Sequence, residues 1–187
     1  MALRSLLIPV LALWPTLAAA TEARPLPMKV PVAPPAGAAA LCRTLPFACA
    51  GGQGAAVPAT VMAEIARINR AANRIPALTD QAQYGRAEVW ALPTARGGDC
   101  EDIVLLKKRA LLRAGIAPDR LLIATVLDPN RAGHAVLILR AEAGDLVLDN
   151  LTDAILRWDR TGYAFLRVQD PAAPDRWVTS FAGGFLG

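Results

Sequence analysis

The chain has 187 residues, of which 54% are hydrophobic and 19% are charged, so it is long enough for one domain with a substantial apolar core. Its formal net charge is +4, and the basic residues are spread along the chain rather than clustered with aromatic residues. This distribution lacks the basic face that nucleic-acid binding requires, so we expect no nucleic-acid partner.

The N-terminal segment MALRSLLIPVLALWPTLAAA, residues 1–20, carries one arginine, then an apolar stretch, then a small-residue A-x-A ending. This pattern predicts a secretory signal peptide that is cleaved after about Ala20, and hence an exported protein. An uncleaved membrane anchor is the alternative, but Pro9 and Pro15 interrupt a stretch that is already short for a bilayer span.

Residues 21–40 are rich in proline and alanine and show no periodic apolar pattern, which predicts a flexible lead-in before a folded domain at 41–187. The segment LCRTLPFAC then places Cys42 and Cys49 seven residues apart. In an oxidising compartment this spacing favours a local disulfide, although two buried thiols are the alternative. A disulfide here leaves Cys100 as the unpaired one of three cysteines.

Two helices are predicted in the first half of the domain. The segment 58–75 places apolar residues at helical spacing and arginines on the opposite face. An irregular stretch at 81–94 follows, punctuated by glycine and proline. A second, more fully buried helix is predicted from Asp99 to Ala114 and ends before Gly115.

The second half of the chain alternates apolar runs with turn sequences. We expect strands at 120–127, 134–140, 145–150, 155–159, 163–170 and 176–180. The second and third of these should form a hairpin around Glu142. Helices followed by antiparallel strands favour an α+β fold, with N-terminal helices packed on an antiparallel sheet.

The stretch GGDCEDIVLLKKRALLRAG, residues 97–115, places Cys100 in the first turn of the second helix. Backbone N–H groups and the helix dipole stabilise a thiolate there, which lowers the pKa of a cysteine, and the same N–H groups help to bind an oxyanion. The chain has a single histidine and no CxxC or HExxH spacing, so a zinc site is disfavoured. A cysteine nucleophile activated by His134 remains.

His134 opens one strand of the predicted hairpin, and Asp149 lies near the end of the other. Antiparallel pairing brings these positions to within about two residues of being opposite. Cys100, His134 and Asp149 therefore form a candidate triad of nucleophile, general base and orienting carboxylate. Taken singly, a histidine at a strand start is often a surface or satisfied core residue, and an Asp-Asn pair after a strand often forms a turn.

Three acids flank the cysteine: Asp99, Glu101 and Asp102. Helix capping explains acids at this position, since they interact favourably with the helix dipole. Beside a sulfur that must ionise, however, their charges raise its pKa, and a calcium ion bound by them would relieve this conflict. A second oxyanion donor is also needed in principle, and Trp90 or Gln83 could supply it, although core packing is the more ordinary role for Trp90.

The segments QYGRAEVWALP, GGDCEDIVLLKKRALLRAGI, GHAVLIL, GDLVLDNL and WDRTGYAFLRVQ occur in this order over roughly residues 41–180. Together they resemble the bacterial transglutaminase-like cysteine proteinases. The resemblance implies a papain- and transglutaminase-like core, with Cys100 as nucleophile, His134 as general base and Asp149 as orienting carboxylate. It also implies calcium bound by the acids that flank the cysteine.

The members of that family that are like its best-known one cleave a large surface adhesin and are held in check by an inner-membrane receptor that responds to cyclic-di-GMP. The resemblance therefore implies a periplasmic cysteine endopeptidase that cleaves a biofilm adhesin or another exported protein, with an inner-membrane regulatory receptor as a second partner. A transglutaminase or amidase with the same triad, and a non-catalytic binding module on the same scaffold, are the alternatives.

Overall fold

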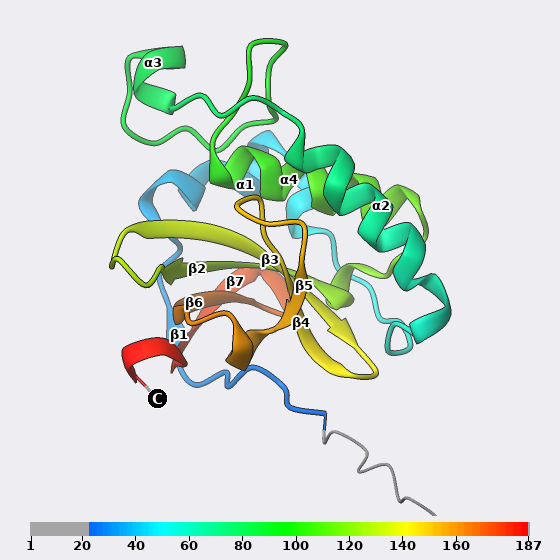
Figure 1. Ribbon diagram of the computed structural model, residues 1–187. Coiled ribbons are helices and arrows are strands. Elements are labelled where there is room, and N and C mark those ends of the chain that lie inside the picture. The colour runs from blue at the N-terminus through cyan, green and yellow to red at the C-terminus, as the bar shows by residue number, and fades with distance from the viewer. Residues whose placement is uncertain (1–22, 187) are drawn as a thin grey trace, which may run out of the picture.

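The computed structural model describes residues 23–186, so the predicted signal peptide at 1–20 lies outside the described residues. The described chain forms an α+β fold in which helices pack on one antiparallel sheet, as the order of the predicted elements indicated (Figure 1). Within residues 23–186, no helix combines the length and apolar character needed to cross a membrane.

Over the described residues, seven strands form a single sheet in the order β1-β7-β6-β2-β3-β4-β5, and all neighbouring pairs are antiparallel. The predicted strands correspond to β2 to β7, and β1 is an additional edge strand. The bounds are β1 Pro31–Val32, β2 Leu121–Leu127, β3 Gly133–Ala141, β4 Gly144–Leu148, β5 Ile155–Arg157, β6 Ala164–Asp170 and β7 Ala173–Ala182.

The α-helices are α1 (Leu41–Thr44), α2 (Met62–Asn73), α3 (Asp80–Tyr84) and α4 (Cys100–Arg113). The two predicted helices are α2 and α4. The short helix α3 lies in the stretch that we expected to be irregular. Its ends are explained by local chemistry, because the Thr79 side chain accepts a hydrogen bond from the Ala82 N–H and Gly85 ends the helix with a φ of 67°.

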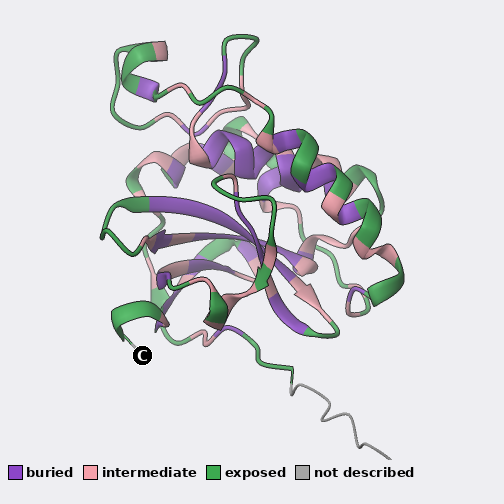
Figure 2. Cartoon of the chain, viewed as in Figure 1, coloured by how far each residue is buried: buried purple, intermediate pink, exposed green. Residues whose placement is uncertain are grey.

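The sheet is apolar on both faces. Successive residues of a strand point to opposite faces, and both sets include buried apolar residues here. In β3, Leu137 and Leu139 belong to the core cluster that includes Val104 and Leu105 of α4. The intervening Val136 and Ile138 belong to a second cluster, on the opposite face. Figure 2 shows that the buried residues follow the strands and the sides of α2 and α4 that face the sheet.

The second face is covered partly by the segment that we expected to be a flexible lead-in. Leu26 is buried in the second cluster, and its backbone N–H donates to Asp145 Oδ2 at 2.8 Å. The short strand β1 pairs with β7. This part of the chain therefore belongs to the folded unit, because a sheet with two apolar faces requires cover on both sides.

Cys42 and Cys49 form the predicted disulfide, with their Cα atoms 5.3 Å apart. The bridged segment is attached to the sheet through Ala48, whose carbonyl accepts a hydrogen bond from the Gln169 side-chain amide of β6 at 3.0 Å. Cys100 is the free cysteine of the described chain.

Candidate active site

Cys100 is the first residue of α4, the position at which the sequence pattern placed it. The approach to the helix depends on Gly97, which has a φ of 140° and where a Cβ atom would lie 2.3 Å from the carbonyl oxygen of Pro76. The Gly98 N–H donates to that same carbonyl, and the Gly98 carbonyl accepts from the Leu78 N–H. These bonds hold the chain around 76–80 beside the start of α4.

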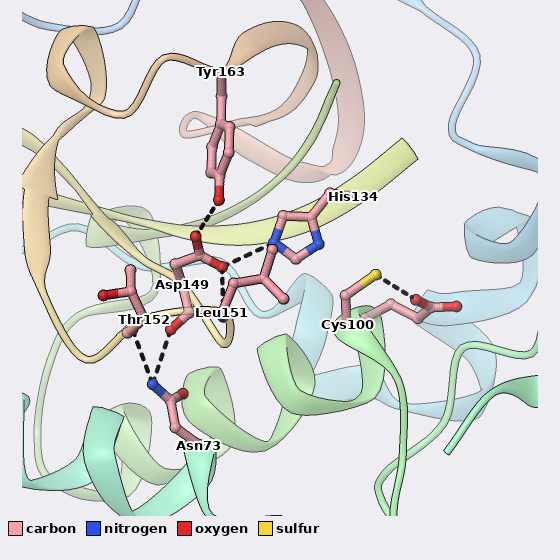
Figure 3. Close-up of polar contacts among 8 residues, drawn as sticks. Asn73, Cys100, His134, Asp149, Leu151, Thr152 and Tyr163 are labelled. Carbon is pink, nitrogen blue, oxygen red and sulfur yellow. Dashed lines mark hydrogen bonds and ion pairs between the residues drawn. The ribbon is translucent and has the colours of Figure 1, made fainter. Parts of the chain in front are cut away.

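His134 and Asp149 lie together, as the predicted hairpin indicated. The β3–β4 register pairs Leu137 with Leu148, so the two side chains come from adjacent strand ends. His134 Nε2 lies 2.8 Å from Asp149 Oδ1, and both residues are buried. Figure 3 shows the Cys100 sulfur and the imidazole turned toward one another, with Nε2 on the far side of the ring, next to Asp149.

Asp149 is held by two further groups that the sequence did not point to. Its Oδ1 also accepts a hydrogen bond from the Leu151 N–H at 3.0 Å, and its Oδ2 accepts one from the Tyr163 hydroxyl. The Tyr163 ring packs edge-to-face on His134. Burial alone would raise the pKa of Asp149, but the hydrogen bonds from His134 and Tyr163 bring it below its ordinary value.

The environment of the Cys100 sulfur differs from the expectation of a lowered pKa at a helix start. Burial raises the pKa of the thiol well above its ordinary value, and the Glu101 carboxylate raises it further. Glu101 Oε2 accepts a hydrogen bond from the thiol, with the two atoms 3.1 Å apart. The backbone N–H of Ala135 acts in the opposite direction and favours the thiolate.

Two hollows in the described part of the molecule border both Cys100 and His134. One has a volume of about 250 Å³ and includes Trp90, Glu88 and Arg167 in its lining. The other, of about 490 Å³, has a more apolar lining that includes Ile75, Leu78 and Leu151. The cysteine and histidine thus lie between two concave surfaces, which is the arrangement needed to bind an extended substrate on both sides of the reacting bond.

The structure gives no support for Trp90 or Gln83 as the second oxyanion donor. The Trp90 indole N–H donates to Glu88 Oε2 at 3.1 Å, and its ring packs edge-to-face on Trp177, which agrees with a role in core packing. Gln83 lines neither of the two hollows that border Cys100. Its side-chain carbonyl instead accepts a hydrogen bond from the Thr94 hydroxyl.

Three carboxylates beside Cys100 have oxygen atoms that all lie within 4.8 Å of one another: Asp80, Asp99 and Glu101. Asp99 occupies the N-cap position, but its side chain makes no cap hydrogen bond and instead accepts from the Asp80 N–H at 3.2 Å. Capping therefore does not explain Asp99. Asp80 was missed from the sequence because it is far along the chain from Cys100, in a segment without a strong pattern.

Asp102 lies next to this group. Its Oδ1 accepts a hydrogen bond from the Ala91 N–H, and burial, with the charges of Asp99 and Asp80, raises its pKa to about 7. One buried oxygen atom on each of Asp80, Asp99 and Asp102 has no hydrogen-bond partner among residues 23–186. A compact set of carboxylates with unpartnered oxygens fits the ligand preference of calcium.

Comparison with known proteins shows the family of the chain. A family described as bacterial transglutaminase-like cysteine proteinases matches residues 28–182, so the chain belongs to this family of cysteine proteinases. No curated protein matches the chain.

Similar solved structures come from Legionella pneumophila. Calcium-bound LapG matches with a TM-score of 0.55 and 24% identity, covering 67% of this chain and 74% of that one. A second LapG structure gives a TM-score of 0.51 at 24% identity, over 59% of this chain and 65% of that one. EGTA-treated LapG gives 0.50 at the same identity, over 58% and 62%. At this identity the likeness establishes the shared fold.

Proposed function

We propose that the protein is an exported cysteine endopeptidase in which Cys100 is the nucleophile, His134 the general base and Asp149 the orienting carboxylate. The observation that carries this proposal is the buried 2.8 Å contact between His134 Nε2 and Asp149 Oδ1 beside a free thiol at a helix start. A carboxylate on Nε2 leaves Nδ1 to accept the thiol proton and stabilises the imidazolium that forms.

The reaction is acyl transfer. The Cys100 thiol gives its proton to His134 Nδ1, and the sulfur forms a bond to the scissile carbonyl carbon. When the carbon–nitrogen bond breaks, the imidazolium donates this proton to the leaving amine. His134 then deprotonates a water molecule, which hydrolyses the thioester and restores the thiol. Asp149 keeps the ring in one orientation through both steps.

We also propose that Asp80, Asp99 and Glu101, with Asp102 next to them, hold a calcium ion. A bound dication would offset the carboxylate charge that raises the pKa of the neighbouring thiol. The calcium-bound form of LapG from Legionella pneumophila supports this assignment.

The catalytic assignment is tested with Cys100→Ala and His134→Ala. Each variant should lose cleavage of a bacterial surface-protein extract, measured by mass spectrometry of new N-termini, while its thermal unfolding stays close to that of the wild type. Glu142→Gln, at an exposed hairpin turn, is the control and should cleave normally. Proteolysis by Cys100→Ala at the wild-type rate would refute the proposal.

The calcium assignment is tested by titration calorimetry on chelator-treated protein. We expect the wild type to bind calcium and Asp80→Asn to bind it about tenfold more weakly or less, because affinity depends on the number of charged ligands. Glu142→Gln should bind as the wild type does. Equal affinities in all three proteins would show that Asp80 is not a calcium ligand. Activity that a calcium-selective chelator leaves unchanged would show that calcium is not required.

We propose the periplasm as the location and a surface adhesin or another exported protein as the substrate, with an inner-membrane receptor as regulator. The predicted export signal and the family membership support this. The same mass spectra distinguish hydrolysis from the alternative transamidation, because a transglutaminase would produce cross-linked peptides in place of new termini.

A further inference from the structure

Asp149 begins an exposed loop, although its own side chain is buried. The loop at 149–154 joins β4 to β5, and the strand pairing on either side of it stops at Leu148 and Ile155. Residues 151 to 154 are exposed. The hydrogen bonds to the Asp149 carboxylate orient the side chain, but the main chain of such a loop also needs an anchor if the carboxylate is to stay opposite His134.

Asn73, the last residue of α2, provides contacts that meet this requirement (Figure 3). Its side-chain nitrogen donates to the carbonyl oxygen of Asp149 at 3.1 Å and to that of Thr152 at 3.0 Å. It also lies 2.8 Å from Asp153 Oδ1. One amide group therefore bonds to both the beginning and the far side of the loop.

The anchor connects the loop to the helix layer of the site. The helix α2 packs against α4, which begins at Cys100. Asn73 also lines the hollow of about 490 Å³ that borders Cys100 and His134. The Asn73 amide thus links the Asp149 main chain to α2, which packs against the helix that carries the thiol.

We propose that Asn73 is a positioning residue, whose amide fixes the loop so that the Asp149 carboxylate stays on His134 Nε2. This inference rests on the proposed role of Asp149. Asn73 takes no part in bond making. Its effect is transmitted through the loop, so it should be visible at the histidine ring as well as in turnover.

Asn69 offers a matched comparison, one helical turn earlier on the same face of α2. It is fully buried, and its amide reaches the same loop only at the Asp153 carbonyl, at 3.4 Å. Replacing Asn69 should reduce folding stability without releasing the Asp149 main chain. A general loosening of α2 and a specific loss of positioning can therefore be separated.

The experiment compares Asn73→Ala, the isosteric Asn73→Asp and Asn69→Ala with the wild type by NMR of the imidazole. The chain has one histidine, so its ring signals need no further assignment. In the wild type, the proton on Nε2 should be visible and protected from exchange, because it bonds to a buried carboxylate. We expect both Asn73 variants to lose this signal, and Asn69→Ala to keep it even if its unfolding midpoint is lower.

A second readout is alkylation of Cys100 by iodoacetamide at pH 7.5. The Asn73 variants should react about tenfold or more slowly, since small displacements of catalytic groups cost up to ~10²-fold in rate. Unchanged imidazole signals and alkylation rates in folded Asn73→Ala or Asn73→Asp would overturn the inference. If the Asn73 variants lose the signal but the wild type cleaves no peptide, the positioning role of Asn73 stands and the proposed protease function is rejected.

Discussion

At the scale of single residues, the state of the Cys100 thiol depends on opposing neighbours. Burial and the Glu101 carboxylate raise its pKa, and the Ala135 N–H favours the thiolate. The helix start alone therefore does not activate this cysteine. A partner that takes the proton must compensate, and the groups that hold His134 and Asp149 in place become as important as the thiol's own position.

Tyr163 is the clearest of these groups, because its hydroxyl bonds to Asp149 Oδ2. Tyr163→Phe removes this donor and leaves a buried carboxylate oxygen without it, which costs about 1–3 kcal/mol. We expect the free energy of unfolding in urea to fall by about that amount and kcat/KM for cleavage to fall with it, since the carboxylate is less firmly oriented. The pKa of Asp149 should rise, because the Tyr163 hydrogen bond lowers it.

The control for this variant is again Glu142→Gln, on the exposed hairpin turn. That change should leave both unfolding and cleavage near their wild-type values. If Tyr163→Phe and Glu142→Gln behave alike, the contact between Tyr163 and Asp149 contributes nothing measurable.

At the scale of elements, α4 carries two adjacent lysines whose side chains are completely buried, Lys107 and Lys108. The Nζ atom of Lys108 donates to Gln169 Oε1 at 2.7 Å. That of Lys107 has no hydrogen-bond partner in the described part of the chain. Burial lowers the pKa of each amine to about 7. Replacing each of the two lysines should therefore change the free energy of unfolding differently, although both lie on the same helix and in the same core.

Lys107→Met should stabilise the protein. The substitution keeps an unbranched side chain and removes an amine whose burial without a partner is unfavourable by about 1–3 kcal/mol. We expect the free energy of unfolding in urea to rise by a similar amount. Lys108→Met is the comparison, and it should be neutral or destabilising because it removes a bonded donor. A lower unfolding midpoint for Lys107→Met than for the wild type would show that Lys107 has a stabilising partner.

At the scale of the whole molecule, the parts predicted correctly from the sequence are those with local signals. Alternating apolar runs predicted β2 to β7, and the hairpin register predicted the contact between His134 and Asp149. The segment before residue 41 was different, because its place on the sheet depends on an apolar face formed more than 80 residues later. Asp80 and Asn73 were missed for the same reason, since their partners are distant in sequence.

The buried lysines were not anticipated either, because charges on a helix are ordinarily solvated. Their burial has a consequence for the whole fold, since the folded-state pKa of about 7 lies below the ordinary value of 10.5. Between these two pH values, the unfolded chain binds protons that the folded chain does not. Through these two amines unfolding takes up protons, so the lysines contribute a stability that increases as the pH rises from about 7 toward 10.5.

We therefore expect the slope of the urea midpoint against pH, measured between pH 8.5 and pH 10 at fixed calcium, to be more positive in the wild type than in the lysine variants. Starting at pH 8.5 keeps the measurement above the pKa of Asp102, which burial raises to about 7. Burial also raises the pKa of the Cys100 thiol, of the Tyr163 hydroxyl and of Glu101, the last to about 8, and these groups oppose the lysines in this range, so the slopes of the variants are compared with that of the wild type. The slope should be smaller in Lys107→Met and smaller again in the double variant Lys107→Met/Lys108→Met. Because linkage depends only on the difference in bound protons, equal slopes in the three proteins would mean that both amines remain charged in the folded protein.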